Sequence, residues 1–426
     1  MSKNKEIVSV EDFYFINIKH LWRSFSNQTF AYWSICAYLI FEFVRPQSLV
    51  PSLDVLPWAK LCLISSLLFS ILDKGITWVR STPNIWMIMF LTAILLSWAF
   101  SYYPEYSKFH LMDFIGWFVI YFIIINVVNT RERFYIFLLI YIISAAKIAI
   151  GTTKIWALRG FSFTTWGLVG PPGFFQNSGE LAVLMIMLFP LTYYMFIWLR
   201  PSINLWQKIL LLTFVVCPVI TTLGASSRGA QVALAVQIAF MFRKHFFNIK
   251  KLAFILVLIS TLFYILPQEQ KDRFSDAGDD KTSQQRFLYW EHGWEMMKEN
   301  PFFGVGFYNF IPYYNDYYPH DTLYGSAQLP HNIFIQVGTD TGFIGLSIFL
   351  AILLSCATMT KNIQKKGNSK DPFALYISTG LAYGVLGFVI SGQFVTITYY
   401  PFLWIHLALL SALSNIVLNK RLLQAS

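Results

Sequence analysis

The sequence predicts an all-α integral membrane protein with about 12 transmembrane helices and one large polar loop that contains an amphipathic helix. Only 13% of the 426 residues are charged, against about 25% in soluble proteins, which is too little to cover a water-exposed surface. Hydrophobic residues make up 56% of the chain, and the aromatic content of 18% suits the interfacial belts of a helical bundle. The net charge of +10 resides mainly in short loops between apolar runs, so no nucleic-acid partner is expected.

A helix needs about 20 apolar residues to cross a bilayer, and this length defines the predicted spans. They lie near residues 29–45, 55–72, 84–101, 111–128, 133–150, 179–199, 205–224, 229–243, 250–267, 331–359, 373–391 and 399–418. The chain therefore divides into the N-terminal segment 1–28, nine spans within 29–267, the polar loop 268–330, three spans within 331–418 and the tail 419–426.

The positions of the basic residues predict how the chain is oriented. About 20 of the 32 Lys and Arg residues fall in alternate short segments, the pattern that marks the cytoplasmic side of a membrane protein. With an even number of spans, both termini are then cytoplasmic and the loop 268–330 lies on the outer side. We expect a multi-pass protein with any site on that outer face.

Within the long loop, residues 283–300 are predicted to form the amphipathic helix. Ser283 is a suitable N-cap, Phe287, Trp290 and Trp294 recur at helical spacing, and Pro301 follows the end. Such a helix is expected to lie on the membrane surface with its tryptophans facing the lipid.

His331 stands where the polar loop enters the tenth span, directly after Pro330. The positive end of the helix dipole disfavours imidazolium, so a neutral ring is expected there, able to act as a general base on a hydroxyl. The alternative is an interfacial polar residue that only begins the span.

Three arginines on the predicted outer face are candidate anion ligands. Arg228 lies between the seventh and eighth spans, where an arginine beside a helix N-terminus suits a phosphate. Arg286 falls in the first turn of the loop helix, and Arg159 follows the fifth span. The alternatives are snorkelling of Arg228 to lipid headgroups and solvated surface charges for the other two.

The acidic residues of the loop show no register of metal ligands, so neither a metal nor another cofactor is expected. Arginines suit a lipid-linked pyrophosphate, and a histidine base suits a hydroxyl nucleophile. A sugar hydroxyl that attacks an anomeric carbon, with lipid pyrophosphate leaving, uses both groups and requires no metal.

Several motifs together resemble the O-antigen ligase and polymerase superfamily. They are Asn300-Pro301-Phe302-Phe303-Gly304-Val305-Gly306, Pro330-His331-Asn332-Ile333-Phe334-Ile335-Gln336, Thr341-Gly342-Phe343-Ile344-Gly345-Leu346, Ser226-Ser227-Arg228-Gly229, Arg286 with Trp290, and Phe41-Glu42-Phe43-Val44-Arg45-Pro46-Gln47. The resemblance implies a metal-independent, inverting glycosyltransferase of the GT-C type in the inner membrane of a Gram-negative bacterium. Its periplasmic site would take a glycan from undecaprenyl pyrophosphate in lipopolysaccharide biosynthesis.

The resemblance also implies roles for individual residues. His331 would be the base or would orient the acceptor hydroxyl, while Arg228, Arg286 and Arg159 would contact the pyrophosphate. Supporting roles near the acceptor or the loop are expected for Asn332, Trp290, Gln176 and Asn177, although Gln176-Asn177-Ser178 departs from the Asn-Pro-Asn type motif of the family.

Within this superfamily the ligase, which transfers glycan to lipid A–core, is the leading interpretation. A polymerase that joins lipid-linked repeats and a ligase that acts on a protein hydroxyl remain alternatives. A polysaccharide flippase is disfavoured because charged residues are sparse inside the spans. The expected partners are the lipid-linked donor, the lipid A–core acceptor and membrane lipid.

Overall fold

The computed structural model describes residues 17–243 except 74, 75, 77, 80, 165 and 166, residues 280–418 except 367–370, and the single positions 264, 271 and 278. All regular secondary structure in these residues is helical, which confirms the predicted all-α class. Eight of the described helices are long and apolar enough to cross a membrane. They are α5 (Thr82–Ala99), α6 (Pro104–Val127), α7 (Arg131–Leu158), α8 (Ser178–Leu199), α9 (Leu205–Gly224), α15 (Ile333–Lys366), α16 (Pro372–Ser391) and α17 (Pro401–Leu418).

Three predicted spans correspond to shorter apolar helices. They are α2 (Phe30–Leu39) with its π-helical continuation Ile40–Val44, α4 (Trp58–Leu72) and α10 (Arg228–Phe242). The predicted span 250–267, apart from position 264, lies outside the described residues, as do the N-terminal residues 1–16 and the tail 419–426. The remaining helices are α1 (Ile18–Ser26), α3 (Pro46–Leu49), α13 (Lys281–Glu299) and α14 (Phe310–Tyr317), with 3-10 turns at Pro51–Leu53 and Pro319–Asp321.

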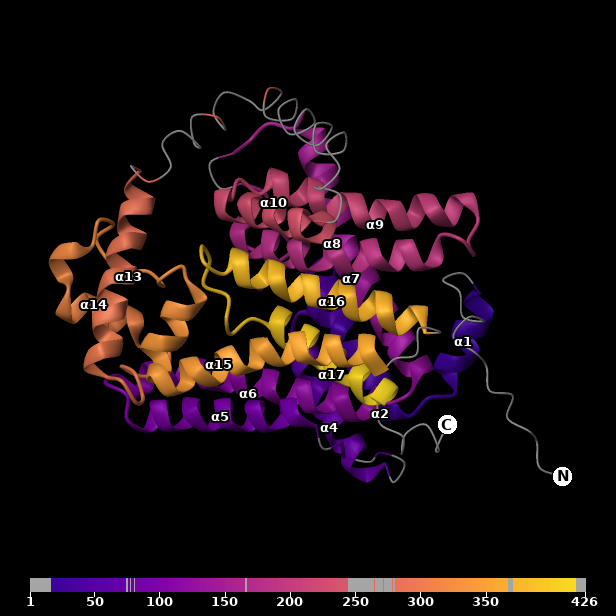
Figure 1. Ribbon diagram of the computed structural model, residues 1–426, viewed down its shortest axis with the longest axis horizontal. Coiled ribbons are helices and arrows are strands. Elements are labelled where there is room, and N and C mark those ends of the chain that lie inside the picture. The colour runs from indigo at the N-terminus through magenta and orange to yellow at the C-terminus, as the bar shows by residue number, and fades with distance from the viewer. Residues whose placement is uncertain are drawn as a thin grey trace.

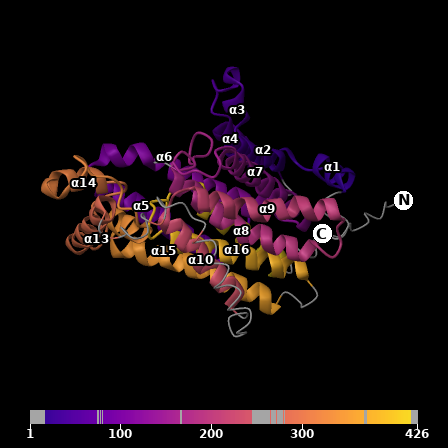
Figure 2. The same ribbon diagram turned by 90° about the horizontal axis from the view of Figure 1, so that it is seen from above.

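The long helices run side by side as one bundle, with α13 and α14 at one end and α1 at the other (Figure 1). At its centre α8 lies against α16 in both views (Figures 1 and 2). Glycines of α16 allow the two backbones to approach closely: a methyl group at Gly380 would lie 2.9 Å from Leu191 Cα, and one at Gly384 would lie 2.9 Å from Met187 O. Small residues at such contacts are typical of helix packing in membranes.

Helix α13 begins earlier than the predicted Ser283 start. Asp280 is the N-cap, because its carboxylate accepts two hydrogen bonds from Ser283. The backbone N–H of Ser283 donates at 3.2 Å and the Ser283 hydroxyl donates at 2.7 Å. The predicted apolar stripe is divided between two environments: Trp290 is half-buried beside α15, whereas Phe287 and Trp294 remain exposed.

Glycines also bring α13 against the first turns of α15. A methyl group at Gly293 would lie 2.5 Å from Ile335 Cγ2, and one at Gly338 would collide with Met297 Sδ. The loop helix is therefore packed on the helix that follows His331.

The apolar run 331–359 predicted one continuous helix for the tenth span, but the structure shows a break. Helix α15 is interrupted at Gly342, whose φ of 67° lies in the left-handed region. At the break, the backbone N–H of Phe343 donates to Pro301 O at 2.8 Å, and that of Val305 donates to Thr339 O at 2.8 Å. The segment 300–306 thus takes over backbone hydrogen bonds that the interrupted helix cannot make.

Candidate functional site

The backbone around His331 is fixed from two sides. Trp290 of α13 donates its indole N–H to Pro330 O at 2.9 Å. His331 itself adopts a left-handed φ of 52°, and its backbone N–H donates to Thr396 Oγ1 at 2.7 Å, in the segment between α16 and α17. A non-glycine residue in this region is uncommon and costs about 1–3 kcal/mol, so these contacts maintain a strained conformation.

Asn332 ties the start of α15 to the same segment. Its Oδ1 accepts the backbone N–H groups of Phe334 at 2.9 Å and Ile335 at 3.3 Å, as an N-cap does. Its Nδ2 donates to Gln393 Oε1 at 3.3 Å. Asn332 therefore supports the backbone that carries His331.

His331 is half-buried. Burial, and after it the positive charge of Arg286, lowers the pKa of His331 from 6.5 to about 4. The ring is consequently neutral at neutral pH, in the direction expected from the sequence. The larger cause is desolvation rather than the dipole of the helix that follows.

Arg228 is the first residue of α10 and reaches across to α13. Its Nη2 donates to Asp280 Oδ2 at 2.8 Å, and both side chains are about one-quarter exposed. Burial acts to raise the pKa of Asp280, but hydrogen bonds from Ser283 and Arg228 together hold it at about 2. Asp280 therefore carries a full negative charge that joins the starts of α10 and α13.

Arg286 lies one and a half turns into α13, close to Arg228. Burial and the like charge of Arg228 both lower the pKa of Arg286, while Asp280 opposes this effect. Among the described residues, no acceptor lies within hydrogen-bond distance of its buried Nε. Part of its hydrogen-bonding capacity is thus free for a ligand.

The structure brings three of the predicted site residues into one electrostatic group. Arg228 acts on Arg286, and Arg286 acts on His331. Two guanidinium groups can bind a dianionic phosphate or pyrophosphate through charge-assisted hydrogen bonds. A neutral imidazole beside them can accept a hydrogen bond or a proton from a hydroxyl group.

Arg159 is not part of this group. It is the exposed C-cap of α7, and within the described part of the chain its guanidinium makes no hydrogen bond or ion pair. Gln176 is also exposed. Their predicted roles remain predictions.

Asn177 is the N-cap of α8, where its Oδ1 accepts the backbone N–H of Gly179 at 2.8 Å. Close by, Tyr400 donates its hydroxyl hydrogen to Glu180 Oε1 at 2.7 Å. A methyl group at Gly179 would lie 3.1 Å from Val395, so this turn packs on the segment that holds His331.

Sequence reasoning missed Asp280 and Thr396 as partners of the site. Asp280 lies three residues before the expected cap Ser283, and an aspartate at that position can also cap the loop helix. Its residue type and position could therefore have identified it. Thr396 lies 65 residues from His331 in a segment without a motif, and no sequence signal marks it.

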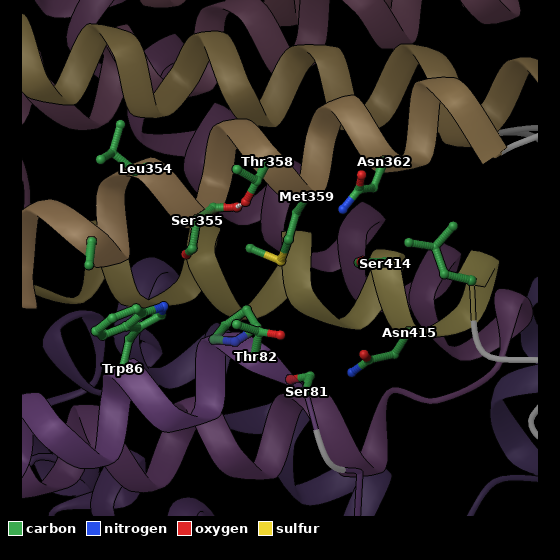
Figure 3. A pocket seen from close by; sticks show the side chains of 13 residues that line it. Ser81, Thr82, Trp86, Leu354, Ser355, Thr358, Met359, Asn362, Ser414 and Asn415 are labelled. Carbon is green, nitrogen blue, oxygen red and sulfur yellow. Dashed lines mark hydrogen bonds between the residues drawn. The ribbon is translucent and has the colours of Figure 1, made fainter.

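A cavity of about 570 Å³ lies away from these residues, between α5, α15 and α17 (Figure 3). Hydroxyl and amide side chains line much of it, among them Ser355, Asn362 and Asn415. Its lining contains no charged side chain, so it does not offer the charge complementarity that a pyrophosphate requires.

Fold and site together define a multi-helix membrane protein with an arginine pair next to a neutral histidine. Residues 213–350, which include Arg228, Arg286 and His331, match the family model described as O-antigen ligase. This match, over about a third of the chain, supports the O-antigen ligase superfamily, whose members are glycosyltransferase-like enzymes. A comparison with curated proteins gave no match.

Proposed function

We propose that the protein is a glycan ligase of the GT-C type. It transfers an assembled glycan from undecaprenyl pyrophosphate to a sugar hydroxyl of lipid A–core on the periplasmic side of a Gram-negative inner membrane. The observation that carries this proposal is the electrostatic coupling of a half-buried, neutral His331 to Arg286 and, through it, to Arg228.

The arginines serve the donor in this proposal. Negative charge builds on the pyrophosphate as the bond between the anomeric carbon and the phosphate oxygen breaks. Guanidinium groups already in place stabilise that charge without reorganisation, and they make the reaction metal-independent. Undecaprenyl pyrophosphate is the leaving group.

His331 serves the acceptor. Its neutral ring accepts a hydrogen bond from the attacking hydroxyl, whose oxygen forms the new bond to the anomeric carbon with inversion. With a pKa of about 4, the free enzyme has a weak base. Bound pyrophosphate offsets the charge of Arg286, so the base strengthens once the donor is in place. The hydroxyl proton then moves to the imidazole.

The experiment that tests this function is transfer by the purified protein from a lipid-linked donor to lipid A–core in the presence of a chelator. We expect activity in the parent and none in His331→Ala, with both proteins showing the same thermal unfolding. Loss of parent activity in chelator would refute the metal-independent mechanism, and normal activity of the His331→Ala variant would refute the role of the histidine.

A deletion strain distinguishes the ligase from the polymerase of the same superfamily. Long glycan chains that accumulate on the carrier lipid support the ligase. A single repeat attached to the core indicates the polymerase instead and overturns the proposed acceptor.

A further inference from the structure

The segment between α7 and α8 contacts Arg45 and the turn that precedes Arg228. At Gly167, with a φ of 69°, it packs on the backbone of Ala225, in the turn that precedes Arg228. At Gly173, with a φ of 101°, it packs on the guanidinium of Arg45: a methyl group there would lie 2.7 Å from Cζ and 2.8 and 2.9 Å from the two Nη atoms. One segment therefore links the arginine assigned to the donor with a second arginine.

The backbone presents Arg45 in an unusual way. It follows the π-helical turn Ile40–Val44 and has a left-handed φ of 52°. Turns of π-helix and left-handed non-glycine residues both concentrate at functional sites, because they cost stability. Because Gly173 has no side chain, its backbone can pack closely on the guanidinium of Arg45.

Among the described residues Arg45 forms no close ion pair, although its charge acts on the buried Glu42. Within the described part of the chain its side chain makes no hydrogen bond, and no carboxylate oxygen lies within 4.0 Å of it. Glu42, one turn earlier, is buried with an unpaired Oε1 and remains beyond that distance. The planar donors of Arg45 are therefore available to a ligand.

A second cation lies next to Arg45. Lys147 donates from Nζ to the carbonyl oxygen of Val44, the residue before Arg45, at 3.2 Å. Lys147 is exposed although it lies inside α7, a candidate membrane span. An ammonium group at such a position is costly without a counter-charge. Lys147 and Arg45 together therefore favour an anionic ligand.

We propose that Arg45 and Lys147 form a second phosphate site, which binds a phosphate group of the acceptor lipid. This inference rests on the proposed function, in which Arg228 and Arg286 hold the pyrophosphate of the donor. Transfer between two lipid-borne molecules requires that both be anchored. The segment from Gly167 to Gly173 packs on Arg45 and on the turn before Arg228, so it connects the backbone of the donor anchor to the acceptor anchor.

Binding of bisphosphorylated lipid A to the purified full chain tests this site, with fully dephosphorylated lipid A as the matched probe. We expect the parent to prefer the phosphorylated form, and Arg45→Gln and Lys147→Gln each to weaken that binding by about tenfold. Arg200→Gln, which removes an exposed arginine at the far end of α8, is the matched control and leaves binding unchanged. Equal binding by Arg45→Gln and the parent overturns the proposal.

Competition identifies the source of the phosphate. Unlabelled lipid A, phosphatidylglycerol and inorganic phosphate each compete with labelled lipid A. If phosphatidylglycerol or inorganic phosphate competes as strongly as unlabelled lipid A, the site binds anions in general and the acceptor assignment is overturned. Gly173→Ala provides a second route to the same test, because its methyl group displaces the Arg45 guanidinium and should also weaken binding. Thermal unfolding checks that each variant is folded.

Kinetics separate this site from the proposed function. Arg45→Gln should raise the KM for lipid A–core about tenfold and leave the KM for the donor unchanged. If the parent transfers no glycan at all, the proposed function fails, yet the binding of lipid A and its dependence on Arg45 can still be measured. If transfer occurs and both KM values are unchanged in Arg45→Gln, the second site fails alone.

Discussion

The charge of Arg286 should influence the pH below which His331 no longer acts as a base. The pKa of His331 falls from 6.5 to about 4 through two causes, of which burial is the larger and Arg286 the smaller. The contribution of Arg286 is therefore less than half of this difference, about 1 pKa unit at most. Replacing Arg286 with Gln removes the charge and should raise the pKa of His331 by up to that amount, towards 5.

The assay is the pH dependence of kcat/KM, which reports pKa values of the free enzyme. Because protonated His331 cannot accept a proton from the hydroxyl, the rate falls as pH decreases through its pKa. In the parent this acid limb should be centred near pH 4. In Arg286→Gln it should move upward, while the plateau drops because a pyrophosphate contact is lost.

Arg286→Lys is the matched control for this prediction. Lysine keeps the positive charge but cannot make the bidentate contact of arginine, so the plateau should drop while the acid limb remains near its parental position. An Arg286→Gln profile with an unchanged acid limb would refute the electrostatic coupling. A limb that moves equally in both variants would show that the change arises from packing rather than charge.

Three further perturbations test other contacts of the site. Arg228→Ala should abolish transfer and Arg228→Lys should restore only part of kcat/KM for the donor, since lysine binds phosphate as a point charge; full activity in either variant contradicts the pyrophosphate role. Asp280→Asn keeps a helix cap but removes the ion pair, so the free energy of unfolding at pH 7 should fall by about 1 kcal/mol after allowance for solvent screening. Because the folded pKa of Asp280 is lowered to about 2, this difference should disappear as pH falls from about 4 to 2, and denaturant unfolding at several pH values checks it. Gly338→Ala should destabilise the fold by about 1–3 kcal/mol through its collision with Met297, and Met297→Ala in the same chain should recover part of the loss; a Gly338→Ala protein with parental stability would show that α13 and α15 tolerate separation.

The helices could be predicted because each one corresponds to a continuous apolar run, which is visible in the local sequence. The run 205–224 corresponds to α9 (Leu205–Gly224), and the run 179–199 corresponds to α8 (Ser178–Leu199). The start of α13 was misplaced by three residues because Asp280 and Ser283 are both good caps, and the choice depends on the contact of Asp280 with Arg228. A partner 52 residues away in the chain is not visible in a local pattern.

The site could be predicted only in part for the same reason. His331 and Arg286 were identified because each lies near the start of a helix, a position that can be read from the chain itself. The contacts that fix them come from distant segments: Thr396 reaches the backbone of His331, and Gly173 packs against Arg45. Neither contact follows from periodicity or charge.

The two glycine-containing motifs, Gly304-Val305-Gly306 and Thr341-Gly342-Phe343, contact each other in the structure. Gly342 allows α15 to break, and the segment 300–306 fills the break with backbone hydrogen bonds to Phe343 and Thr339. This segment directly follows α13, so it fixes the end of α13 to α15 at the break.

Arg286 belongs to α13 and His331 immediately precedes α15, so the position of one relative to the other depends on how these two helices are joined. Trp290 joins them beside His331, Gly293 and Gly338 allow their close packing, and the break at Gly342 joins them again beyond the end of α13. A substitution at Gly342 should therefore alter the coupling of Arg286 to His331 without touching either residue, and so shift the acid limb of the rate profile.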